Sequence, residues 1–427
     1  MKASADVLIV GAGAAGLTAA RELSAAGMRV LLLEGRDRVG GRILTHHMPE
    51  YPVELGAEFV HGRPPEICDS ANAAGLKPVQ IRWNAMRRKQ NRWLDAGEVI
   101  SDMDRLFEKM PADQPDQSFQ EFIDHTGADP EVKEQALRFV EGFHAADPRR
   151  VSVHSLIRSN KAEEKIDGDR QFRFAEGYDA LVKSISERIN WKSCELLLNT
   201  AVAEVAWRPG EALLKTVSGS ELRAPRCLIT VPLGVIKTGG LRFQPALAEK
   251  EKALQALEMG PVIRASLCFR DKFWQAVSRF KDVSFLFTDD AHFPTWWTSH
   301  PLPFPILTGW AAGRYARALA GLSSAQVIDR ALKSLGNIFA IEVERLRSDL
   351  QAGFTHDWQD DRFSCGAYSY ALVGGRDAGR DLGAPVAGTL FFAGEGTDSD
   401  GQNGTVHGAI ASGLRAAKEI LAADQRR

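Results

Sequence analysis

The sequence predicts an α/β fold built around a parallel sheet, and three observations support this class. An apolar strand pattern at residues 6–10 leads at once into a glycine-rich turn and a helix pattern at residues 14–26. A second strand pattern follows at residues 29–33, so strand, helix and strand alternate as in a parallel unit. Near the other end, a strand pattern at residues 389–392 again precedes a helix pattern, at residues 406–421.

The composition is that of an ordinary folded protein. The chain has 427 residues, 44% hydrophobic and 25% charged, and its net charge of -2 lacks the basic excess of a general nucleic-acid binder. No apolar run is long enough for a transmembrane helix, and the first apolar stretch enters a glycine turn rather than a cleavage site. Five cysteines lie far apart, which argues against a metal site and against disulfides. We therefore expect a cytoplasmic protein with no metal, nucleic-acid or membrane partner.

The glycine-rich turn reads G-x-G-x-x-G, with Gly11, Gly13 and Gly16 between a strand and a helix. In such a turn the first glycine allows a tight bend, the second lets the backbone approach a pyrophosphate, and the third lets helix and strand pack closely. The helix pattern begins at Ala14 and Ala15, where free N–H groups and the positive end of the helix dipole favour phosphate. The pattern is that of a Rossmann-like nucleotide-binding domain.

Glu34 ends the second strand, where an acidic residue accepts hydrogen bonds from ribose hydroxyls and repels a 2′-phosphate. FAD or NAD is therefore favoured over NADP. The next segment adds further residues that we assign to the cofactor: Gly35, Arg36, Gly40, Gly41 and Arg42. Its glycines allow another close backbone approach, and its arginines can fork onto phosphate oxygens. Without Glu34 before it, the same segment would also fit a solvated basic loop.

The middle of the chain gives weaker signals. Residues 129–130 (Asp-Pro) mark a helix start, because Asp caps a helix and Pro fits its first turn. Residues 158–170 are highly charged and are expected to form an exposed loop. Strand patterns occupy parts of residues 194–235 and 262–310, and the second region is rich in aromatic side chains. Residues 323–343 have the periodicity of an amphipathic helix.

Four blocks of sequence carry a resemblance to a known family. They are residues 7–42, 54–62 (ELGAEFVHG), 231–237 (VPLGVIK) and 391–414, and they extend across nearly the whole chain. Together they resemble the flavin-containing amine oxidases, which include monoamine oxidases, polyamine oxidases and flavin-dependent lysine demethylases. Residues 85–175 match the family poorly.

The resemblance implies a discontinuous FAD-binding domain with an inserted α+β substrate domain. The FAD-binding domain would comprise residues 1–80, 176–258 and 366–427, and the substrate domain residues 81–175 and 259–365.

The resemblance also assigns cofactor contacts. Val202 matches a valine that meets the adenine, Gly56 and Ala57 match a loop along the flavin ring, and Glu58 follows in the same block. The remaining matches lie beside the ribityl chain and pyrophosphate, or at the start of a helix that points at the flavin pyrimidine: Gly394, Glu395, Thr405 and Val406. A helix N-terminus there suits the negative charge of reduced flavin.

Four residues are expected at the reaction centre: Trp358, Tyr368, His61 and Arg264. Trp358 and Tyr368 match aromatic residues that face the flavin and the substrate amine, where they hold a neutral amine and exclude water. Monoamine oxidases have a second such tyrosine where this chain has Thr405. His61 belongs to a block similar to that of animal polyamine oxidases and is expected to border the active site, although a lone histidine is more often structural. Of the pair at residues 296–297, two tryptophans, one could line the pocket, but burial in the core is the simpler interpretation.

Two positions depart from the family. Monoamine oxidases attach FAD to a cysteine where this chain has Ala367, with Cys365 two residues earlier, so the resemblance implies non-covalent FAD. The family lysine near flavin N5, linked to oxygen reactivity, is replaced by Arg264, which is bulkier and always protonated. An ordinary surface ion pair is the alternative for Arg264.

The function implied is oxidation of a small-molecule amine by FAD. In that family a hydride passes from the carbon next to nitrogen to flavin N5, the imine hydrolyses to an aldehyde, and molecular oxygen is reduced to hydrogen peroxide. A flavin dehydrogenase or desaturase with another substrate or acceptor, and an FAD-containing scaffold that binds a partner, are the alternatives. An amino-acid oxidase is less favoured, since Phe59 stands where those enzymes have an arginine for the carboxylate. The sequence predicts neither the particular amine nor the oligomeric state.

Overall fold

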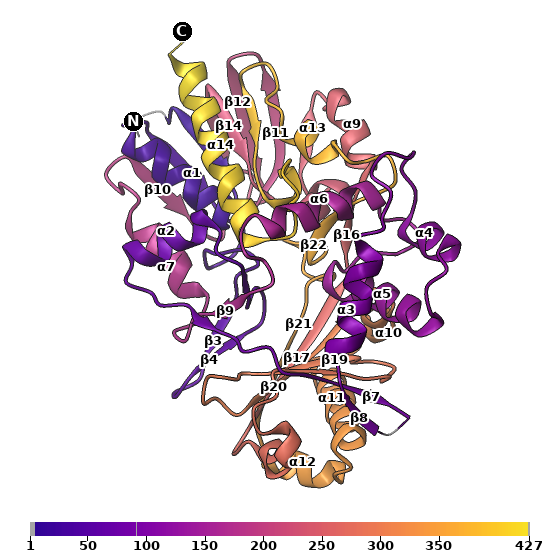
Figure 1. Cartoon of the computed structure of the whole chain (residues 1–427). Helices are drawn as coiled ribbons and strands as arrows, with labels where there is room; N and C mark the ends of the chain where they lie inside the picture. The colour runs from indigo at the N-terminus through magenta and orange to yellow at the C-terminus, as the bar shows by residue number, and fades with distance from the viewer. Residues whose placement is uncertain (1–4, 91, 426–427) are drawn as a thin grey trace.

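The protein is an α/β molecule whose first layer is a parallel five-stranded sheet. The computed structural model describes residues 5–90 and 92–425. In this sheet the strand order is β10-β2-β1-β14-β23, and every pairing is parallel. The strands are β1 (Val7–Val10), β2 (Val30–Leu33), β10 (Cys194–Leu197), β14 (Arg226–Ile229) and β23 (Leu390–Phe392). They lie in the upper part of Figure 1.

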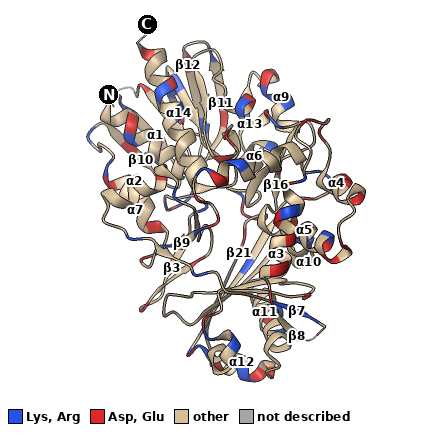
Figure 2. Cartoon of the chain, in the orientation of Figure 1, with Lys and Arg blue, Asp and Glu red and all other residues tan. Residues whose placement is uncertain are grey.

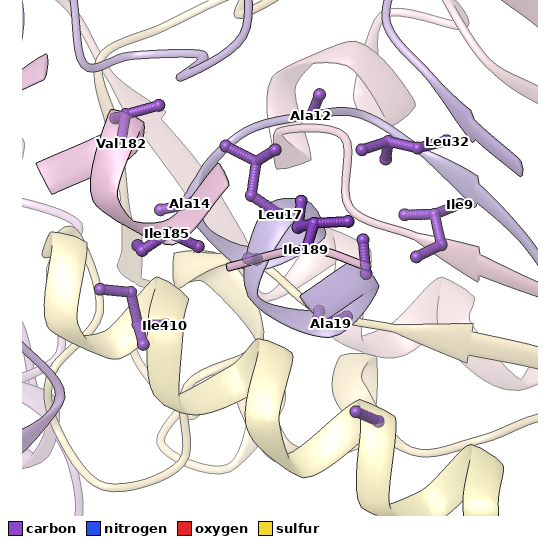
Figure 3. Close-up of a cluster of buried hydrophobic side chains, with 14 of the residues drawn as sticks. Ile9, Ala12, Ala14, Leu17, Ala19, Leu32, Val182, Ile185, Ile189 and Ile410 are labelled. Carbon is purple, nitrogen blue, oxygen red and sulfur yellow. The ribbon is translucent and has the colours of Figure 1, made fainter. Parts of the chain in front are cut away.

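Helices cover one face of this sheet. They are α1 (Ala14–Ala25), α2 (Pro65–Ala73), α7 (Asp179–Glu187) and α14 (Val406–Asp424). Figure 3 shows Ile9, Leu17 and Ile410 in the apolar cluster between these layers. Helices α1 and α14 approach closely at Gly413, where an added Cβ would lie 2.4 Å from the carbonyl oxygen of Ala15.

A second, four-stranded sheet covers the other face. Its order is β13-β12-β11-β15. The strands are β11 (Val202–Arg208), β12 (Glu211–Thr216), β13 (Glu221–Ala224) and β15 (Arg242–Gln244). Val205 and Leu214 of this sheet pack in one buried cluster with Leu8 and Leu33 of the parallel sheet.

A third sheet, of seven strands, forms the lower part of Figure 1. Its order is β21-β17-β20-β19-β18-β7-β8. The strands are β7 (Ala85–Lys89), β8 (Arg92–Asp95), β17 (Val262–Phe269), β18 (Phe285–Phe287), β19 (Thr295–Thr298), β20 (Ile306–Ala312) and β21 (Leu350–Asp357). Helix α11 (Ser324–Phe339) packs its apolar stripe on this sheet and confirms the amphipathic helix expected there.

Four further helices are α3 (Gly97–Phe107), α4 (Phe119–His125), α5 (Pro130–Phe143) and α6 (Val153–Glu164). Helix α5 packs against β20 of the third sheet, whereas α6 lies beside the loop before α14 (Figure 1). Asp129 caps α5 by accepting from the N–H of Glu131, as the Asp-Pro pair indicates. The exposed loop expected at residues 158–170 is wrong in its first half, because α6 continues to Glu164. Leu156, Ser159 and Ala162 are buried, so the charges lie on the remaining faces of a packed helix.

The other elements connect these layers. They are β3 (Thr45–His47), β4 (Pro52–Glu54), β5 (Val60–His61), β6 (Val79–Gln80), β9 (Gln171–Arg173), α8 (Leu233–Lys237), α9 (Ala248–Gln255), β16 (Leu257–Gly260), α10 (Arg314–Leu319), α12 (Val343–Asp349), β22 (Tyr368–Ala371), α13 (Ala378–Gly383) and three short 3-10 helices at residues 273–276, 278–280 and 395–397.

This architecture confirms the predicted fold class, whereas the domain boundaries stay a prediction. Residues of both charge signs are spread along the ribbon in Figure 2. Among the described residues, no helix is both long and apolar enough to cross a bilayer.

Candidate active site

A cavity of about 2100 Å³ extends from the glycine turn after β1 to aromatic side chains of the seven-stranded sheet. With one exception, every residue that the sequence assigned to the cofactor or to catalysis lines it. The exception is Gly16. An added Cβ at that position would lie 1.9 Å from the carbonyl oxygen of Gly11, which fits the predicted role in close helix packing.

The backbone at the start of α1 fits a bound diphosphate. Gly13 precedes the helix and contributes no capping side chain, and the first turn of α1 contains no acidic residue. Gly13 and Gly41 lie opposite each other, so that an added Cβ at Gly13 would be 4.0 Å from the Cα of Gly41. Two bare backbones and a helix N-terminus therefore face the cavity, an arrangement that suits phosphate.

Glu34 is held by backbone donors at the cavity wall. Its two carboxylate oxygens accept from the N–H groups of Ala12 at 2.8 Å and Arg36 at 2.9 Å, and the residue is 7% exposed. Each oxygen retains a further lone pair, so the fixed carboxylate can still accept from ribose hydroxyls.

The sequence suggested that Arg36 could bind phosphate oxygens through both terminal nitrogens, but its guanidinium is not free to do so. It pairs with both carboxylate oxygens of Asp361 at 2.7 and 2.8 Å. Asp361 also bonds His356 at 3.0 Å, and the His356 ring lies 4.1 Å from that of Trp358. Burial alone would raise the pKa of Asp361, but hydrogen bonds from His356 and Arg36 outweigh it and lower that pKa. Arg36 therefore connects the predicted ribose region to the predicted flavin region.

The half-buried Arg42 and the buried Glu395 form an ion pair at 2.8 Å. The second oxygen of Glu395 accepts from the Ser369 hydroxyl at 2.7 Å and the Gly404 N–H at 2.8 Å. The pair thereby joins the segment after β2 to β22 and to the loop before α14. Thr405 caps α14, because its hydroxyl accepts from the N–H of Gly408 at 3.0 Å.

The two predicted aromatic residues are both fixed in place. The Trp358 indole donates to the carbonyl of Leu55 at 3.0 Å and is 3% exposed. The Tyr368 hydroxyl donates to the carbonyl of Phe143 at 2.7 Å. Hydrogen bonds at the polar ends and packing along the rings hold both side chains as rigid walls of the cavity.

Three histidines line the cavity, of which the sequence assigned only His61. Burial lowers the pKa of His61 to about 4. Burial and the neighbouring His61 together lower the pKa of His144 to about 4 and the pKa of His407 to about 3. All three imidazoles are therefore neutral at physiological pH. The position of His407, next to Val406 in a matched block, could have marked it as a site residue.

Arg264 is neither free nor paired at the surface. It is 1% exposed and donates to the carbonyl of Gly56 at 2.9 Å and to Glu58 at 2.6 Å. Glu58 also accepts from the Trp297 indole at 3.0 Å and lies 3.1 Å from Arg173. The carboxylate is thus saturated, and two cations around one anion leave a net positive cluster. No sequence signal pointed to Arg173. For the tryptophan pair at residues 296–297 the sequence favours burial over a place in the cavity wall, and Trp297 is buried and also lines the cavity.

The remaining wall is aromatic and reaches the surface. Ring centroids lie 5.5 Å apart for Trp297 and Trp310, and 5.3 Å apart for Phe59 and Trp297. Phe285 continues the row to Trp83, at 4.8 Å, which is 50% exposed.

Two further observations concern covalent attachment of the cofactor and metal binding. Ala367, at the position of covalent attachment in monoamine oxidases, lines the cavity. The Cys365 sulfur instead approaches the Arg362 carbonyl and the Thr238 hydroxyl. Within residues 5–90 and 92–425, no group of histidine, cysteine or acidic side chains is arranged to hold a metal ion.

Known proteins with similar sequences or structures include several amine oxidases. Polyamine oxidase 4 of Oryza sativa subsp. japonica is 27% identical, over 97% of this chain and 88% of its own length. Lysine-specific histone demethylase 2 of Homo sapiens is also 27% identical, over 98% of this chain and 53% of its own length. Putrescine oxidase bound to putrescine has a TM-score of 0.82 at 22% identity, over 98% of this chain and 99% of that one. Cyclohexylamine oxidase from Brevibacterium oxydans IH-35A has a TM-score of 0.81 at 20% identity, over 99% and 100%.

The fold and the cavity define a flavoprotein-type oxidoreductase. The family described as flavin containing amine oxidoreductase matches residues 14–421, and the chain belongs to that family. It is accordingly an oxidoreductase that acts on CH–N bonds, in a family that uses FAD.

Proposed function

We propose that the protein is an FAD-dependent amine oxidase that oxidises a small-molecule amine at the carbon next to nitrogen. For a primary amine, the amine, oxygen and water yield an aldehyde, ammonia and hydrogen peroxide. FAD, when bound, supplies the two-electron acceptor for this chemistry. The observation that carries the proposal is the single cavity, which joins the predicted dinucleotide site at Gly13 and Glu34 to Trp358 and Tyr368.

The aromatic walls would act by positioning the substrate. Trp358 and Tyr368 are held at their polar ends by backbone carbonyls, so their rings can keep an amine in one pose without reorganising. Packing against apolar ring faces also keeps water from the reacting carbon.

Proton transfer to a side chain has little part in this proposal. The three cavity histidines are too weakly basic to take a proton from an ammonium group, because burial lowers the pKa of each imidazole. Glu58 is saturated by Arg264, Arg173 and Trp297. The amine must therefore lose its proton to solvent and enter the cavity in its neutral form, and Arg264 remains a fixed cation that can stabilise negative charge developing nearby.

We further propose that FAD is bound without a covalent bond, within a domain that comprises residues 1–80, 176–258 and 366–427. The Ala367 side chain has no nucleophile, and the Cys365 sulfur lies against backbone and hydroxyl oxygens instead. The parallel sheet draws all five strands from these three segments, which supports the division.

Anaerobic mixing of the holoenzyme with a panel of amines tests the function. We expect the flavin absorbance to bleach with at least one amine, and hydrogen peroxide to appear when oxygen is admitted. No bleaching with any primary, secondary or polyamine would contradict the proposal.

A dehydrogenase that passes electrons to another acceptor is the second candidate, and Arg264 favours it. An arginine cannot release its proton, so where the family has a lysine Arg264 can act only as a charge and a hydrogen-bond donor, and its terminal nitrogens already donate to Gly56 and Glu58. If reduced enzyme reoxidises far faster with a quinone or dye than with oxygen, this second function is the better description.

A further inference from the structure

Trp358 and Tyr368 lie at the two ends of one loop, at residues 358–366, which follows β21. The N–H of Gly366 donates to the carbonyl of Trp358 at 2.8 Å, so the ends of the loop lie together. Tyr368 then begins β22. The two predicted walls of the amine site therefore depend on what holds the 358–366 loop against the rest of the molecule.

The loop is anchored on the segment after β2, which begins with the predicted ribose ligand Glu34. Asp361 forms its bidentate ion pair with Arg36 there, and the two side chains are 8% and 14% exposed. The Phe363 ring packs on Gly35, where an added Cβ would lie 2.5 Å from a ring carbon. Because that distance leaves no room for a side chain at residue 35, ring and backbone are in direct contact.

His356 extends this anchor from Asp361 to the Trp358 ring. Its Nε2 lies 3.0 Å from the carboxylate, and its ring centroid lies 4.1 Å from that of Trp358. Asp361 is ionised and can only accept, so Nε2 carries the proton of the imidazole and donates. Among the described residues, Asp361 is the only hydrogen-bond partner of the His356 side chain. Asp361 therefore sets the orientation of the His356 ring.

The indole of Trp358 needs this second support. Its N–H donates to the carbonyl of Leu55 at 3.0 Å, and an added Cβ at Gly56 would lie 3.1 Å from a carbon of the same ring. A hydrogen bond at one edge fixes a point of the ring and leaves its tilt open. The His356 ring packs against the indole at an interplanar angle of 51° and limits that tilt.

We propose that Asp361 is a positioning residue for amine oxidation, which acts through His356 on Trp358. Because the same carboxylate binds Arg36, the segment predicted to hold the ribose of the cofactor also sets one wall of the amine site. This inference rests on the proposed function, since Trp358 can position a substrate only if an amine is oxidised beside it. The structure describes both Asp361 and His356, and neither lines the cavity, so neither would touch the substrate.

Asp361→Asn breaks the link, because an amide must present a donor to either Arg36 or His356, which are both donors here. A displacement of about 1 Å at a positioning group can slow a reaction about a hundredfold. In the FAD-loaded enzyme, with an amine that bleaches the wild type, we expect anaerobic flavin reduction to slow at least about tenfold. Asp360→Asn is the matched control, since this exposed neighbouring carboxylate has no side-chain partner among the described residues. It should reduce at the wild-type rate.

His356→Phe keeps a ring against Trp358 and removes only the hydrogen bond to Asp361, so it should lose about as much rate as Asp361→Asn. The double variant should then be no slower than either single variant, because both cut the same link. In Trp358→Phe protein, Asp361→Asn should change the rate by less than about twofold. Losses that multiply in these combinations would overturn the proposal and leave Asp361 a general structural contact.

The position of Trp358 can also be measured without turnover. Fluorine NMR of the FAD-loaded protein, with fluorotryptophan at its nine tryptophans, reports each indole, and Trp358→Phe assigns one signal by its loss. That signal should shift or broaden in Asp361→Asn and stay in place in Asp360→Asn. An unchanged Trp358 signal in Asp361→Asn would overturn the proposal. Should Asp361→Asn fail to fold, a wild-type reduction rate in His356→Phe at equal FAD occupancy would overturn it instead.

The outcomes separate this inference from the proposed function. Bleaching by an amine at the same rate in wild type and Asp361→Asn would overturn the positioning role and leave amine oxidation standing. No bleaching of the wild type by any amine would contradict the proposed function, and a displaced Trp358 signal in Asp361→Asn would then still support the link from Asp361 to Trp358.

Discussion

Replacing Arg264 with Met removes a buried cation and keeps most of the apolar length of the side chain. The charge-assisted bond to Glu58, at 2.6 Å, contributes about 1.5–3 kcal/mol, and the bond to the Gly56 carbonyl contributes about 1 kcal/mol. Arg264 is 1% exposed, so solvent screening does not reduce these values. In the variant, Glu58 still accepts a hydrogen bond from Trp297 and still pairs with Arg173. We therefore expect the free energy of unfolding to fall by about 3 kcal/mol, the low end of the range for breaking a buried ion pair.

The same variant tests the role of Arg264 in reoxidation. A fixed cation stabilises the negative charge that oxygen acquires on its first electron. Stopped-flow reoxidation of pre-reduced Arg264→Met should be several-fold slower than in the wild type, with substrate reduction little altered. Arg264→Lys keeps the charge without the fork and should give an intermediate rate. Equal reoxidation rates in all three proteins, after matching FAD occupancy, would refute the reasoning and leave Arg264 a structural ion pair.

Four further predictions concern the cofactor, the substrate and pH. Acid precipitation should release the yellow cofactor into the supernatant, and flavin retained in the pellet would refute non-covalent binding. Glu34→Gln should weaken FAD binding by about 1.5–3 kcal/mol, because an amide cannot accept from Ala12, Arg36 and a ribose together; unchanged occupancy after dialysis would contradict this. Tyr368→Ala should slow anaerobic flavin reduction by around a hundredfold with FAD retained, whereas Tyr368→Phe tests the hydroxyl bond to Phe143 alone. Burial raises the pKa of Glu54 to about 8, so its contribution to stability is fully present below about pH 4.5 and is lost as the pH rises through 8; Glu54→Gln should flatten that part of the unfolding curve against pH.

Local sequence motifs predicted many of the residues in the candidate dinucleotide-binding part of the cavity. The glycine turn and Glu34 are contiguous with the strands and helix that position them, so a short window of sequence carries their role. Trp358 and Tyr368 were found through family spacing rather than through periodicity. Arg36 shows the limit of this reasoning, since its partner Asp361 lies 325 residues away and no local pattern indicates the pair.

The substrate side was less predictable for a physical reason. Its chemistry depends on side chains that meet only after the chain folds, such as Arg173 against Glu58. The charge density at residues 158–170 indicated a loop, but the burial of one face of α6, at Leu156, Ser159 and Ala162, decides the structure instead. Composition reports how many charges a segment has, whereas the tertiary fold determines which of them remain unpaired.

The place of β23 and α14 has a consequence for synthesis of the chain. Strand β23 is the outer partner of β14, all of whose four residues are buried, and α14 covers α1. A nascent chain or a product truncated before residue 390 would therefore present β14 as an open, apolar sheet edge and leave α1 without its neighbour. The glycine turn is therefore synthesised early, but α1 after it gains its neighbour only when α14 is complete. Shortened chains of this protein should aggregate rather than retain flavin.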